Sequence, residues 1–222
     1  MAGRLRSVLF QGPAGTLEGL WKEAADPAHR RGGAVLGHPH PLHGGTLHNK
    51  VVYRAAQALT RAGYDTLRFN FRGVGLSEGR YDAGRGEVED FRAALDEVER
   101  TVGLPVVAGG FSFGSAVGLK ASAQDRRLAA FVALGLPLAT ESGRLVPRPP
   151  ASVPSLFVVG ENDSFGPPED LDRFLGGTHR MVVIPGADHF FEGQLELLGE
   201  TIADFLASLP VVPVHSASEA PA

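Results

Sequence analysis

The segment from Val106 to Ser115 constrains the possible folds of this chain more than any other stretch. An apolar run ends there in the pattern GxSxG, centred on Ser112, and an AVGLK segment follows it. This order predicts a buried strand, a sharp turn and a helix that begins directly after the serine. Gly110 and Gly114 lie where two backbones approach each other in such a turn, so side chains there would collide. We expect the Ser112 hydroxyl to be exposed at the carboxyl end of the strand, beside the amino end of the helix.

Strands and helices alternate along the chain around this segment. The hydrophobic periods predict strands over residues 4–11, 17–22, 33–37, 64–71, 129–136, 155–160 and 180–184, in addition to the strand that starts at Val106. They predict helices over 46–62, 87–101, 113–124, 168–175 and 192–209. Such alternation is typical of an α/β fold, with a mostly parallel sheet of about eight strands flanked by helices on both faces. The first two strands are expected to form an antiparallel hairpin at one edge.

Residues 1–210 are expected to form a single domain, and residues 211–222 a flexible C-terminal tail. The segment 137–154 contains five prolines and no hydrophobic period of helix length. An inserted cap domain would need such periods, so we expect no cap domain.

Composition and charge exclude several classes of function. The chain of 222 residues has a formal net charge of −4 and scattered Lys and Arg residues, so we expect neither nucleic acid nor an anionic membrane as a partner. It contains no cysteine, which excludes disulfides and a thiol nucleophile. The apolar run Val8–Phe10 is too short for a signal-peptide core, and no run approaches the length of a membrane span. A cytoplasmic protein is therefore expected, and its oligomeric state is not predicted.

Two further residues are placed to activate Ser112. A serine hydroxyl is a poor nucleophile unless a base removes its proton, and the base needs an acid that orients it and stabilises its charged form. Asp163 follows the strand over 155–160, and His189 follows the last strand. The carboxyl ends of parallel strands share one edge of a sheet, so we expect Ser112, His189 and Asp163 to meet there as nucleophile, base and acid.

Other acidic and histidine residues near these positions are weaker candidates. Glu161 is the nearest rival as the acid, and Glu141 is a more distant one that follows the preceding strand. Asp188 is adjacent to the base in the sequence and is poorly placed to orient its ring, so we expect it to cap its own loop. His179 precedes the last strand and should lie at the opposite edge of the sheet.

A tetrahedral intermediate at the serine would need backbone NH donors for its oxyanion. The NH of Phe113, the residue after the serine, is the first candidate. The second donor is expected in the loop after the strand over 33–37, where Pro39 and Pro41 have no NH. This leaves the NH of His40 as the natural donor, with that of Leu42 as the alternative.

The same loop has a second interpretation as a metal site, because four histidines lie close together in it. These are His38, His40, His43 and His48. No cysteine or acidic residue accompanies them in this segment, so we expect no metal.

Arg72–Gly79 is a glycine-rich loop that follows the strand over 64–71. It lacks the lysine of a phosphate-binding loop and the glycine spacing of a dinucleotide site. We therefore expect a surface loop near the site, which an ion pair between Arg72 and Asp90 would anchor.

Four apolar residues flank the predicted site and are expected to line a substrate pocket. These are Leu42, Leu136, Phe165 and Phe190. Phe111 lies beside them, but its place inside the central strand is more typical of a core residue.

Four motifs together resemble the α/β-hydrolase superfamily: His38–Gly45 (HPHPLHGG), Asn70–Gly79 (NFRGVGLSEG), Gly110–Gly114 (GFSFG) and Gly186–Phe191 (GADHFF). The chain is similar to the small, capless bacterial serine esterases related to dienelactone hydrolases, over residues 33–209. This resemblance implies carboxylesterase activity on a small-molecule ester, with neither a metal nor an organic cofactor.

Hydrolysis of short-chain acyl esters through an acyl-enzyme on Ser112 is the leading hypothesis. Amide or peptide hydrolysis and acyl transfer would use the same residues, and the sequence does not separate these reactions. A non-catalytic, ligand-binding member of the fold is a further alternative, against which the complete set of candidate residues argues.

Overall fold

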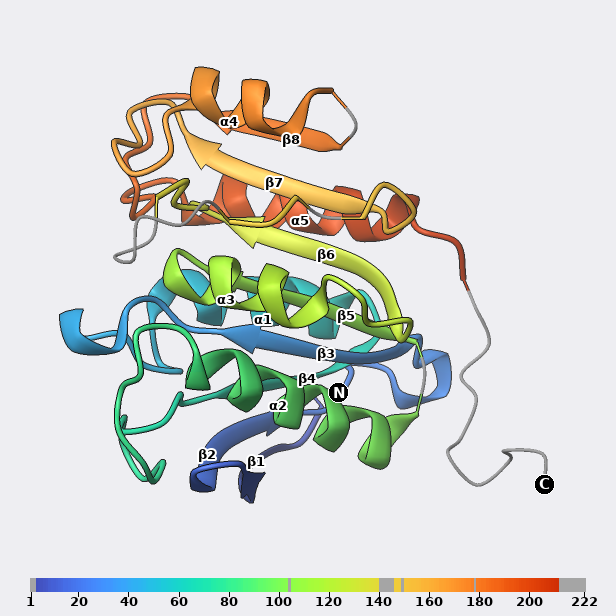
Figure 1. Cartoon of the computed structure of the whole chain (residues 1–222). Coiled ribbons are helices and arrows are strands. Elements are labelled where there is room, and N and C mark those ends of the chain that lie inside the picture. Colours follow the sequence, from blue (N-terminus) through green and yellow to red (C-terminus); the bar gives the residue numbers. More distant parts are fainter. Residues whose placement is uncertain (1–2, 104, 140–145, 149, 178, 212–222) are drawn as a thin grey trace.

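In the computed structural model, eight strands form one sheet with helices on both faces (Figure 1). The structure describes residues 3–103, 105–139, 146–148, 150–177 and 179–211. The strands are β1 (Leu5–Gly12), β2 (Gly15–Lys22), β3 (Gly32–Gly37), β4 (Tyr64–Phe69), β5 (Val106–Phe111), β6 (Leu128–Leu134), β7 (Ser155–Gly160) and β8 (Arg180–Ile184). The helices are α1 (Lys50–Arg61), α2 (Gly86–Val102), α3 (Phe113–Ser122), α4 (Pro168–Leu175) and α5 (Leu195–Ser208), with short 3₁₀ turns η1 (Pro27–His29) and η2 (Pro41–His43). The predicted α/β fold is confirmed.

The sheet has the strand order β1-β2-β4-β3-β5-β6-β7-β8. β1 pairs with β2, and β2 with β4, in antiparallel register, whereas the strands from β4 to β8 along the sheet are parallel. The expected antiparallel hairpin at one edge is therefore confirmed. Because the parallel strands point the same way, the loops that follow β3, β5, β7 and β8 meet at one edge of the sheet (Figure 1).

Two apolar clusters fill the space between the sheet and its helices. α2, α3 and α4 pack on one face of the sheet, and α1 and α5 pack on the other (Figure 1). Successive residues of β5 alternate between the two clusters: Val106 and Ala108 belong to the first and Val107 to the second. The central strand is thus buried on both faces, which explains why its sequence is a continuous apolar run.

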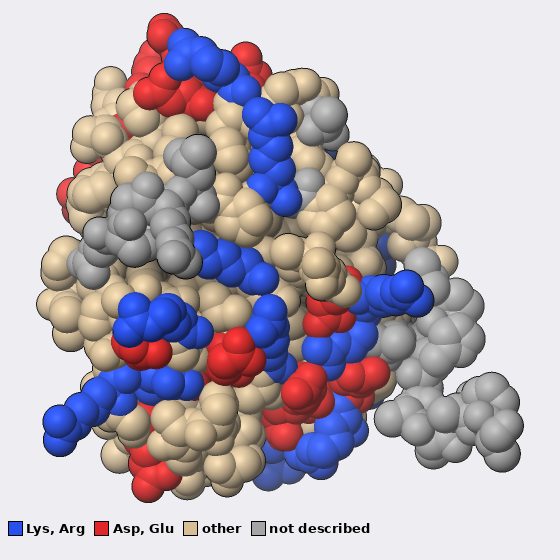
Figure 2. Space-filling view, viewed as in Figure 1, with Lys and Arg blue, Asp and Glu red and all other residues tan. Residues whose placement is uncertain are grey.

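The outer surface of α2 carries charged side chains in pairs of opposite sign. Glu89 forms an ion pair with Arg92, and Glu97 with Arg100, each pair three residues apart on the helix. Figure 2 shows acidic and basic side chains interspersed on this side of the molecule. No helix in the described part of the chain is long and apolar enough to cross a membrane.

Several elements are shorter than the sequence predicts, and local contacts explain where they end. The helix expected from residue 46 begins at Lys50, because the Asn49 side chain accepts hydrogen bonds from the NH groups of Val51 and Val52 and caps it. The strand expected over 129–136 ends at Leu134, because Gly135 has a positive φ of 50° and turns the chain. The last helix begins at Leu195 rather than residue 192.

Some expectations fall wholly or partly outside the described residues. Glu141 and residues 212–222 of the expected tail lie outside them, as does part of the segment 137–154. The described parts of that segment contain no helix and no strand of the sheet, in agreement with the predicted absence of a cap domain. The single-domain organisation of residues 1–210 stays a prediction.

Candidate active site

Ser112 lies in the sharp turn between the end of β5 and the first residue of α3. Its backbone has φ 53° and ψ −119°, a strained conformation for a residue with a side chain. A Cβ atom on Gly110 would lie 2.5 Å from the carbonyl carbon of Gly114, and one on Gly114 would overlap the backbone of Gly37. The prediction that only glycine fits beside this serine is therefore confirmed.

The structure brings Ser112, His189 and Asp163 together in one chain of hydrogen bonds. The Nε2 atom of His189 lies 3.0 Å from the Ser112 hydroxyl oxygen, and its Nδ1 atom lies 2.8 Å from Oδ2 of Asp163. A carboxylate can only accept, so Nδ1 carries the hydrogen and Nε2 is left to accept the hydroxyl proton. His189 and Asp163 are buried, with exposed fractions of 5% and 2%, whereas Ser112 is half-buried.

Backbone NH groups hold the Asp163 carboxylate in place behind the imidazole. Its Oδ1 atom accepts hydrogen bonds from the NH of Phe165 at 2.9 Å and of Gly166 at 3.3 Å. These two backbone hydrogen bonds fix the orientation of the carboxylate beside His189. Both oxygens are thereby engaged, one by the backbone and one by the histidine.

The imidazole of His189 is enclosed by aromatic rings. Ring-centroid distances are 4.4 Å to Phe165, 5.2 Å to Phe111 and 5.3 Å to Phe190. A Cβ atom on Gly135 would lie 3.2 Å from Cε1 of the same ring. Gly135 was not among the predicted site residues, although a glycine directly after an apolar strand can mark such a close approach.

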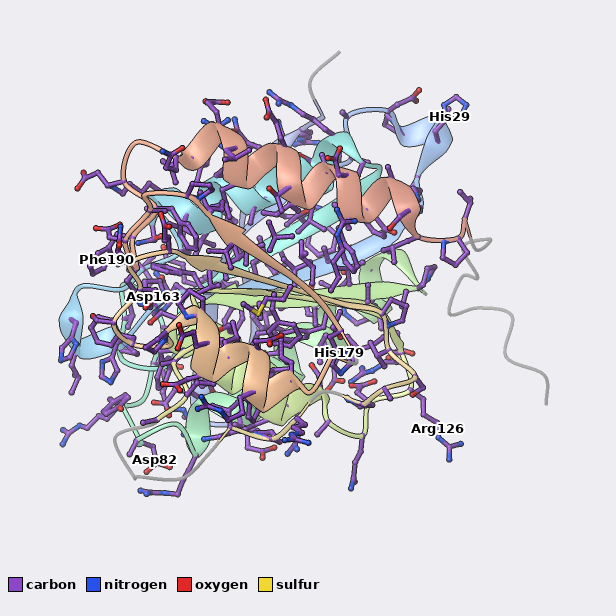
Figure 3. The ribbon with its side chains drawn as sticks, turned by 90° about the horizontal axis from the view of Figure 1, so that it is seen from above. His29, Asp82, Arg126, Asp163, His179 and Phe190 are labelled. Carbon is purple, nitrogen blue, oxygen red and sulfur yellow. The ribbon has the colours of Figure 1, made fainter. Side chains whose placement is uncertain are left out.

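The rival acid and histidine candidates lie elsewhere or are engaged differently. Glu161 accepts the NH of Gly186 at 2.7 Å. Asp188 accepts the NH groups of Phe190 and Glu192, which confirms its expected loop-capping role. Figure 3 shows His179 at the end of the molecule opposite to Asp163, as its position before β8 predicts.

A cavity of about 320 Å³ opens above Ser112. Its walls come from the loop after β3, residues 81–84, one face of α3, residues 137–139, and the loops that carry Phe165 and Phe190. Phe165 and Phe190 line it. Leu42 and Leu136 do not. Leu136 is 1% exposed and packs in the core beneath α3 and α4, and Leu42 is 66% exposed on the outer side of η2.

Comparison with known proteins places this chain in a family. A family model described as an alpha/beta hydrolase domain covers residues 35–209 of the chain. The chain belongs to the alpha/beta hydrolase family.

Proteins similar to this chain include serine hydrolases of known structure. An alpha-beta serine hydrolase homologue from Coxiella burnetii is 37% identical, with a TM-score of 0.81 over 90% of this chain and 96% of that chain. A serine hydrolase without a lid from Xanthomonas campestris is 30% identical, with a TM-score of 0.83 over 95% of this chain and 97% of that chain. An uncharacterized protein from Rickettsia prowazekii is 34% identical over 91% of this chain and 89% of its own length. The predicted resemblance to capless α/β-hydrolases is confirmed.

The histidine-rich loop after β3 is organised by hydrogen bonds. His38 is fully buried; its Nε2 accepts the NH of Phe71 at 3.0 Å and its Nδ1 donates to the carbonyl of Pro39 at 2.6 Å. Burial lowers the pKa of His38 to about 4, so the ring is neutral. With both nitrogens engaged, His38 is not placed to bind a metal, and no group of three or more possible ligands occurs among the described residues.

His40 and Leu42 were the two candidates for the second oxyanion donor. The NH of Leu42 donates to Nδ1 of the His40 ring at 3.2 Å, which removes it from the cavity. The Nε2–H group of His40 therefore donates to the hydroxyl of Tyr81 at 3.0 Å. His40 lines the cavity. The backbone NH of Phe113, the first residue of α3, donates to no described residue.

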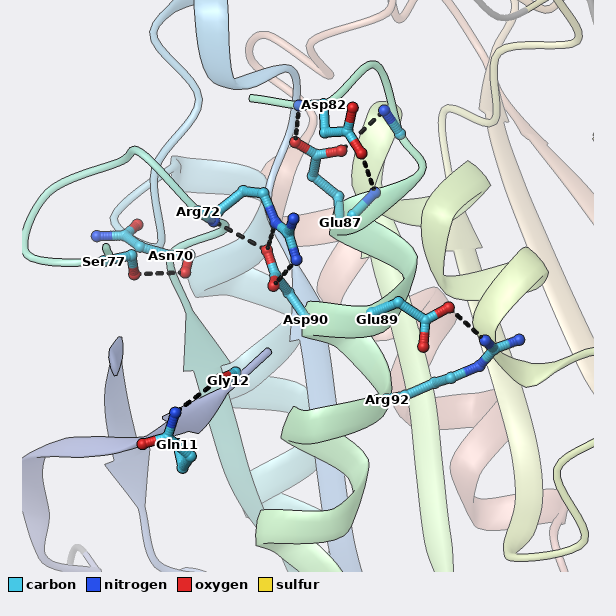
Figure 4. Close-up of polar contacts among 12 residues, drawn as sticks. Gln11, Gly12, Asn70, Arg72, Ser77, Asp82, Glu87, Glu89, Asp90 and Arg92 are labelled. Carbon is cyan, nitrogen blue, oxygen red and sulfur yellow. Dashed lines mark hydrogen bonds and ion pairs between the residues drawn. The ribbon is translucent and has the colours of Figure 1, made fainter. Parts of the chain in front are cut away.

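The glycine-rich loop after β4 is anchored by the ion pair that the sequence predicts. Arg72 donates to both carboxylate oxygens of the fully buried Asp90, at 2.9 and 2.7 Å, and its backbone NH donates at 3.0 Å (Figure 4). The neighbouring carboxylate of Glu87 accepts the NH groups of Asp82 and Gly84 at 2.8 Å each. α2 thus fixes the residue 81–84 wall of the cavity.

Several residues that line the cavity were missed in the sequence. These are Asn49, Tyr81 and Lys120, together with Ala116 and Val117 of α3. The helical spacing of 113, 116, 117 and 120 was a usable signal, because residues at these intervals share one face of a helix. Asn49 and Tyr81 come from separate loops and carry no local signal.

Proposed function

We propose that this chain is a serine hydrolase that cleaves carboxylic esters through an acyl-enzyme on Ser112. The observation that supports the proposal most is the position of His189, within hydrogen-bond distance of both the Ser112 hydroxyl and the Asp163 carboxylate. A buried imidazole in this tautomer is arranged to take a proton from serine and to be stabilised once it is charged.

In the first half of the reaction, the Ser112 oxygen attacks the carbonyl carbon of the ester while its proton passes to Nε2 of His189. The carbonyl oxygen becomes an oxyanion, which accepts hydrogen bonds from the NH groups of Phe113 and His40. When the intermediate collapses, the bond to the alcohol breaks and His189 gives its proton to the leaving oxygen. The acyl group stays on Ser112 as an ester.

In the second half, a water molecule attacks the acyl-enzyme by the same route. His189 takes a proton from the water as it adds to the carbonyl carbon, and the same NH groups hold the second oxyanion. Collapse breaks the bond to Ser112, whose oxygen receives the proton back from His189. The products are a carboxylic acid and an alcohol, and no cofactor takes part in these steps.

The size of the cavity favours small esters over large substrates. Its volume of about 320 Å³ lies at the small end of the range for small-molecule sites. Phe165 and Phe190 supply apolar surface beside the reacting atoms, and both side chains are about half exposed. This apolar surface suits the short acyl chain of an ester.

Replacement of the nucleophile tests the proposal. We expect Ser112→Ala to lower kcat/KM for p-nitrophenyl butyrate by at least about 10³-fold, because the hydroxyl that forms the acyl-enzyme is lost. Ser122→Ala is a matched control, since Ser122 is buried at the other end of α3 and does not line the cavity; it should retain wild-type activity. Wild-type rates in Ser112→Ala would refute the proposal.

A further inference from the structure

The turn that follows β8 carries His189 and continues into a strained residue. Phe191, two positions after the base, has a positive φ of 53°, a conformation that is costly for a residue with a side chain. Among the described residues other than glycine, only Ala83 and Ser112 also have a positive φ. Ser112 is the proposed nucleophile and Ala83 lines the cavity, so backbone strain of this kind is confined to the candidate site in the described part of the chain.

Asp188 holds this turn through three consecutive backbone NH groups. Its carboxylate oxygen Oδ1 accepts the NH of Phe190 at 2.9 Å and that of Glu192 at 3.2 Å. Its backbone carbonyl accepts the NH between them, from Phe191, at 3.2 Å. The strained residue is thus held on both sides by a single aspartate, and His189 lies between that aspartate and the first NH that it binds.

The two ends of the turn are also anchored by packing. The ring of Phe191 is fully buried, and its centroid lies 6.3 Å from that of Phe111. At the other end, a Cβ atom on Gly160 of β7 would overlap the carbonyl oxygens of Ala187 and Asp188. With both ends fixed, the path of the backbone between them sets the position of the imidazole.

We propose that Asp188 is a positioning residue, whose carboxylate holds the imidazole of His189 within hydrogen-bond distance of Ser112. The inference rests on the proposed function, because it concerns the base of that reaction. Asp188 is not among the described residues that line the cavity, so it acts through the turn rather than on the substrate. Nε2 of the base lies 3.0 Å from the serine hydroxyl oxygen, and a misplacement of about 1 Å can lower a rate about 10²-fold.

The charge of Asp188 offers a different explanation for any effect on the rate, because a nearby carboxylate would also stabilise the protonated imidazole. Asparagine separates the two effects. Asp188→Asn keeps the oxygen that accepts the NH groups and removes the charge, whereas Asp188→Ala removes both. If the hydrogen bonds are what matters, the asparagine variant should behave like the wild type.

Two esters of the same acid provide a measurement that does not depend on how much of the protein is folded. The measured quantity is kcat/KM for ethyl butyrate divided by kcat/KM for p-nitrophenyl butyrate. The leaving ethoxide needs the proton of His189, whereas p-nitrophenolate is stable enough to leave without one, so a displaced imidazole slows the ethyl ester more.

We expect Asp188→Ala to lower kcat/KM for p-nitrophenyl butyrate about tenfold, mainly through kcat, and to lower the ratio by a further factor of about five. In Asp188→Asn, both quantities should stay within about twofold of the wild type, because the NH groups keep their acceptor.

Asp26→Ala is a matched control, because Asp26 caps a turn in the same way at a distance from the site. Its Oδ1 accepts the NH of Ala28 at 3.0 Å, at the start of η1. Figure 3 shows His29, the last residue of η1, on the side of the molecule away from Asp163 and Phe190. The rates and the ratio of this variant should equal those of the wild type.

An unchanged ratio in Asp188→Ala would mean that the residue serves folding alone and would overturn the inference. A ratio in Asp188→Asn as low as that in Asp188→Ala would assign the effect to the charge and would also overturn it. Both outcomes are distinct from failure of the proposed function, in which Ser112→Ala would hydrolyse p-nitrophenyl butyrate as fast as the wild type.

Discussion

At the scale of single residues, backbone strain and buried polar groups gather around the serine. A residue with a side chain in the conformation of Ser112 costs on the order of 1–3 kcal/mol, and it persists only where its surroundings fix it. Here the NH of Ser112 donates to the carbonyl of Leu134 at 2.9 Å, and its carbonyl accepts from Ser115 and Ala116 of α3. Backbone strain that neighbouring hydrogen bonds maintain in this way is typical of active sites.

His38 is the buried ionisable group whose protonation bears most directly on folding. It joins the end of β3 to Phe71, and its ring also packs edge-on against the Phe71 ring at 4.8 Å. A proton on Nε2 would remove the acceptor for the Phe71 NH and place a charge in the core. Burial therefore lowers the pKa of His38 to about 4.

This pKa predicts a loss of stability in mild acid. The folded pKa of His38 lies below the unfolded value, so the unfolded state binds the proton first, and stability falls as the pH drops from about 6.5 to about 4. Between pH 7 and pH 5, His38 should lower the free energy of unfolding by about 2 kcal/mol. Urea unfolding at the two pH values measures this change.

His38→Gln supplies the control, because its amide oxygen can still accept the Phe71 NH but does not titrate. The variant should lose less stability than the wild type between the two pH values, by the same amount of about 2 kcal/mol. Equal losses in the two proteins would show that His38 is not the group responsible.

At the scale of elements, α2 serves as the support for one wall of the cavity. Its first turns carry Glu87 and Asp90, which hold residues 82–84 and Arg72 respectively. A Cβ atom on Gly86 would overlap the guanidinium of Arg72, so this glycine allows the pair to form.

Removal of two different carboxylates of α2 should have very different effects on the free energy of unfolding (Figure 4). Asp90→Ala should lower the free energy of unfolding by about 3 kcal/mol, because it leaves a mostly buried arginine without its partner. Glu89→Ala breaks an exposed pair with Arg92 on the same helix and should cost below about 1 kcal/mol. Urea unfolding of both variants measures the difference, and similar costs would contradict the assigned role of Asp90.

The order and type of the elements could be predicted from hydrophobic periods, and their ends could not. Asn49 caps α1 through its side chain, and Gly135 ends β6 through its backbone, but neither contact is visible in an apolar pattern. Ser112, Asp163 and His189 could be predicted, because each follows a recognisable strand. The residues that line the cavity could not all be predicted. Tyr81 and Asn49 reach it from loops whose course depends on tertiary contacts. Leu42 was wrongly predicted to line it, because η2 turns this side chain outward.

At the scale of the whole molecule, parallel strands bring distant parts of the sequence to one edge. Ser112 and His189 are 77 residues apart, and Asp163 and His189 are 26 residues apart, yet all three follow strands that end at the same edge (Figures 1 and 3). No cap domain occurs among the described residues, and Ser112 is half-buried.

Covalent labelling with a fluorophosphonate, followed by mass spectrometry, tests most directly whether Ser112 is a nucleophile that His189 activates. The wild type should gain one phosphonyl group, located on Ser112, and His189→Asn should react slower by on the order of 10³-fold. Labelling of a different residue, or reaction of His189→Asn at the wild-type rate, would contradict the proposed roles of Ser112 and His189.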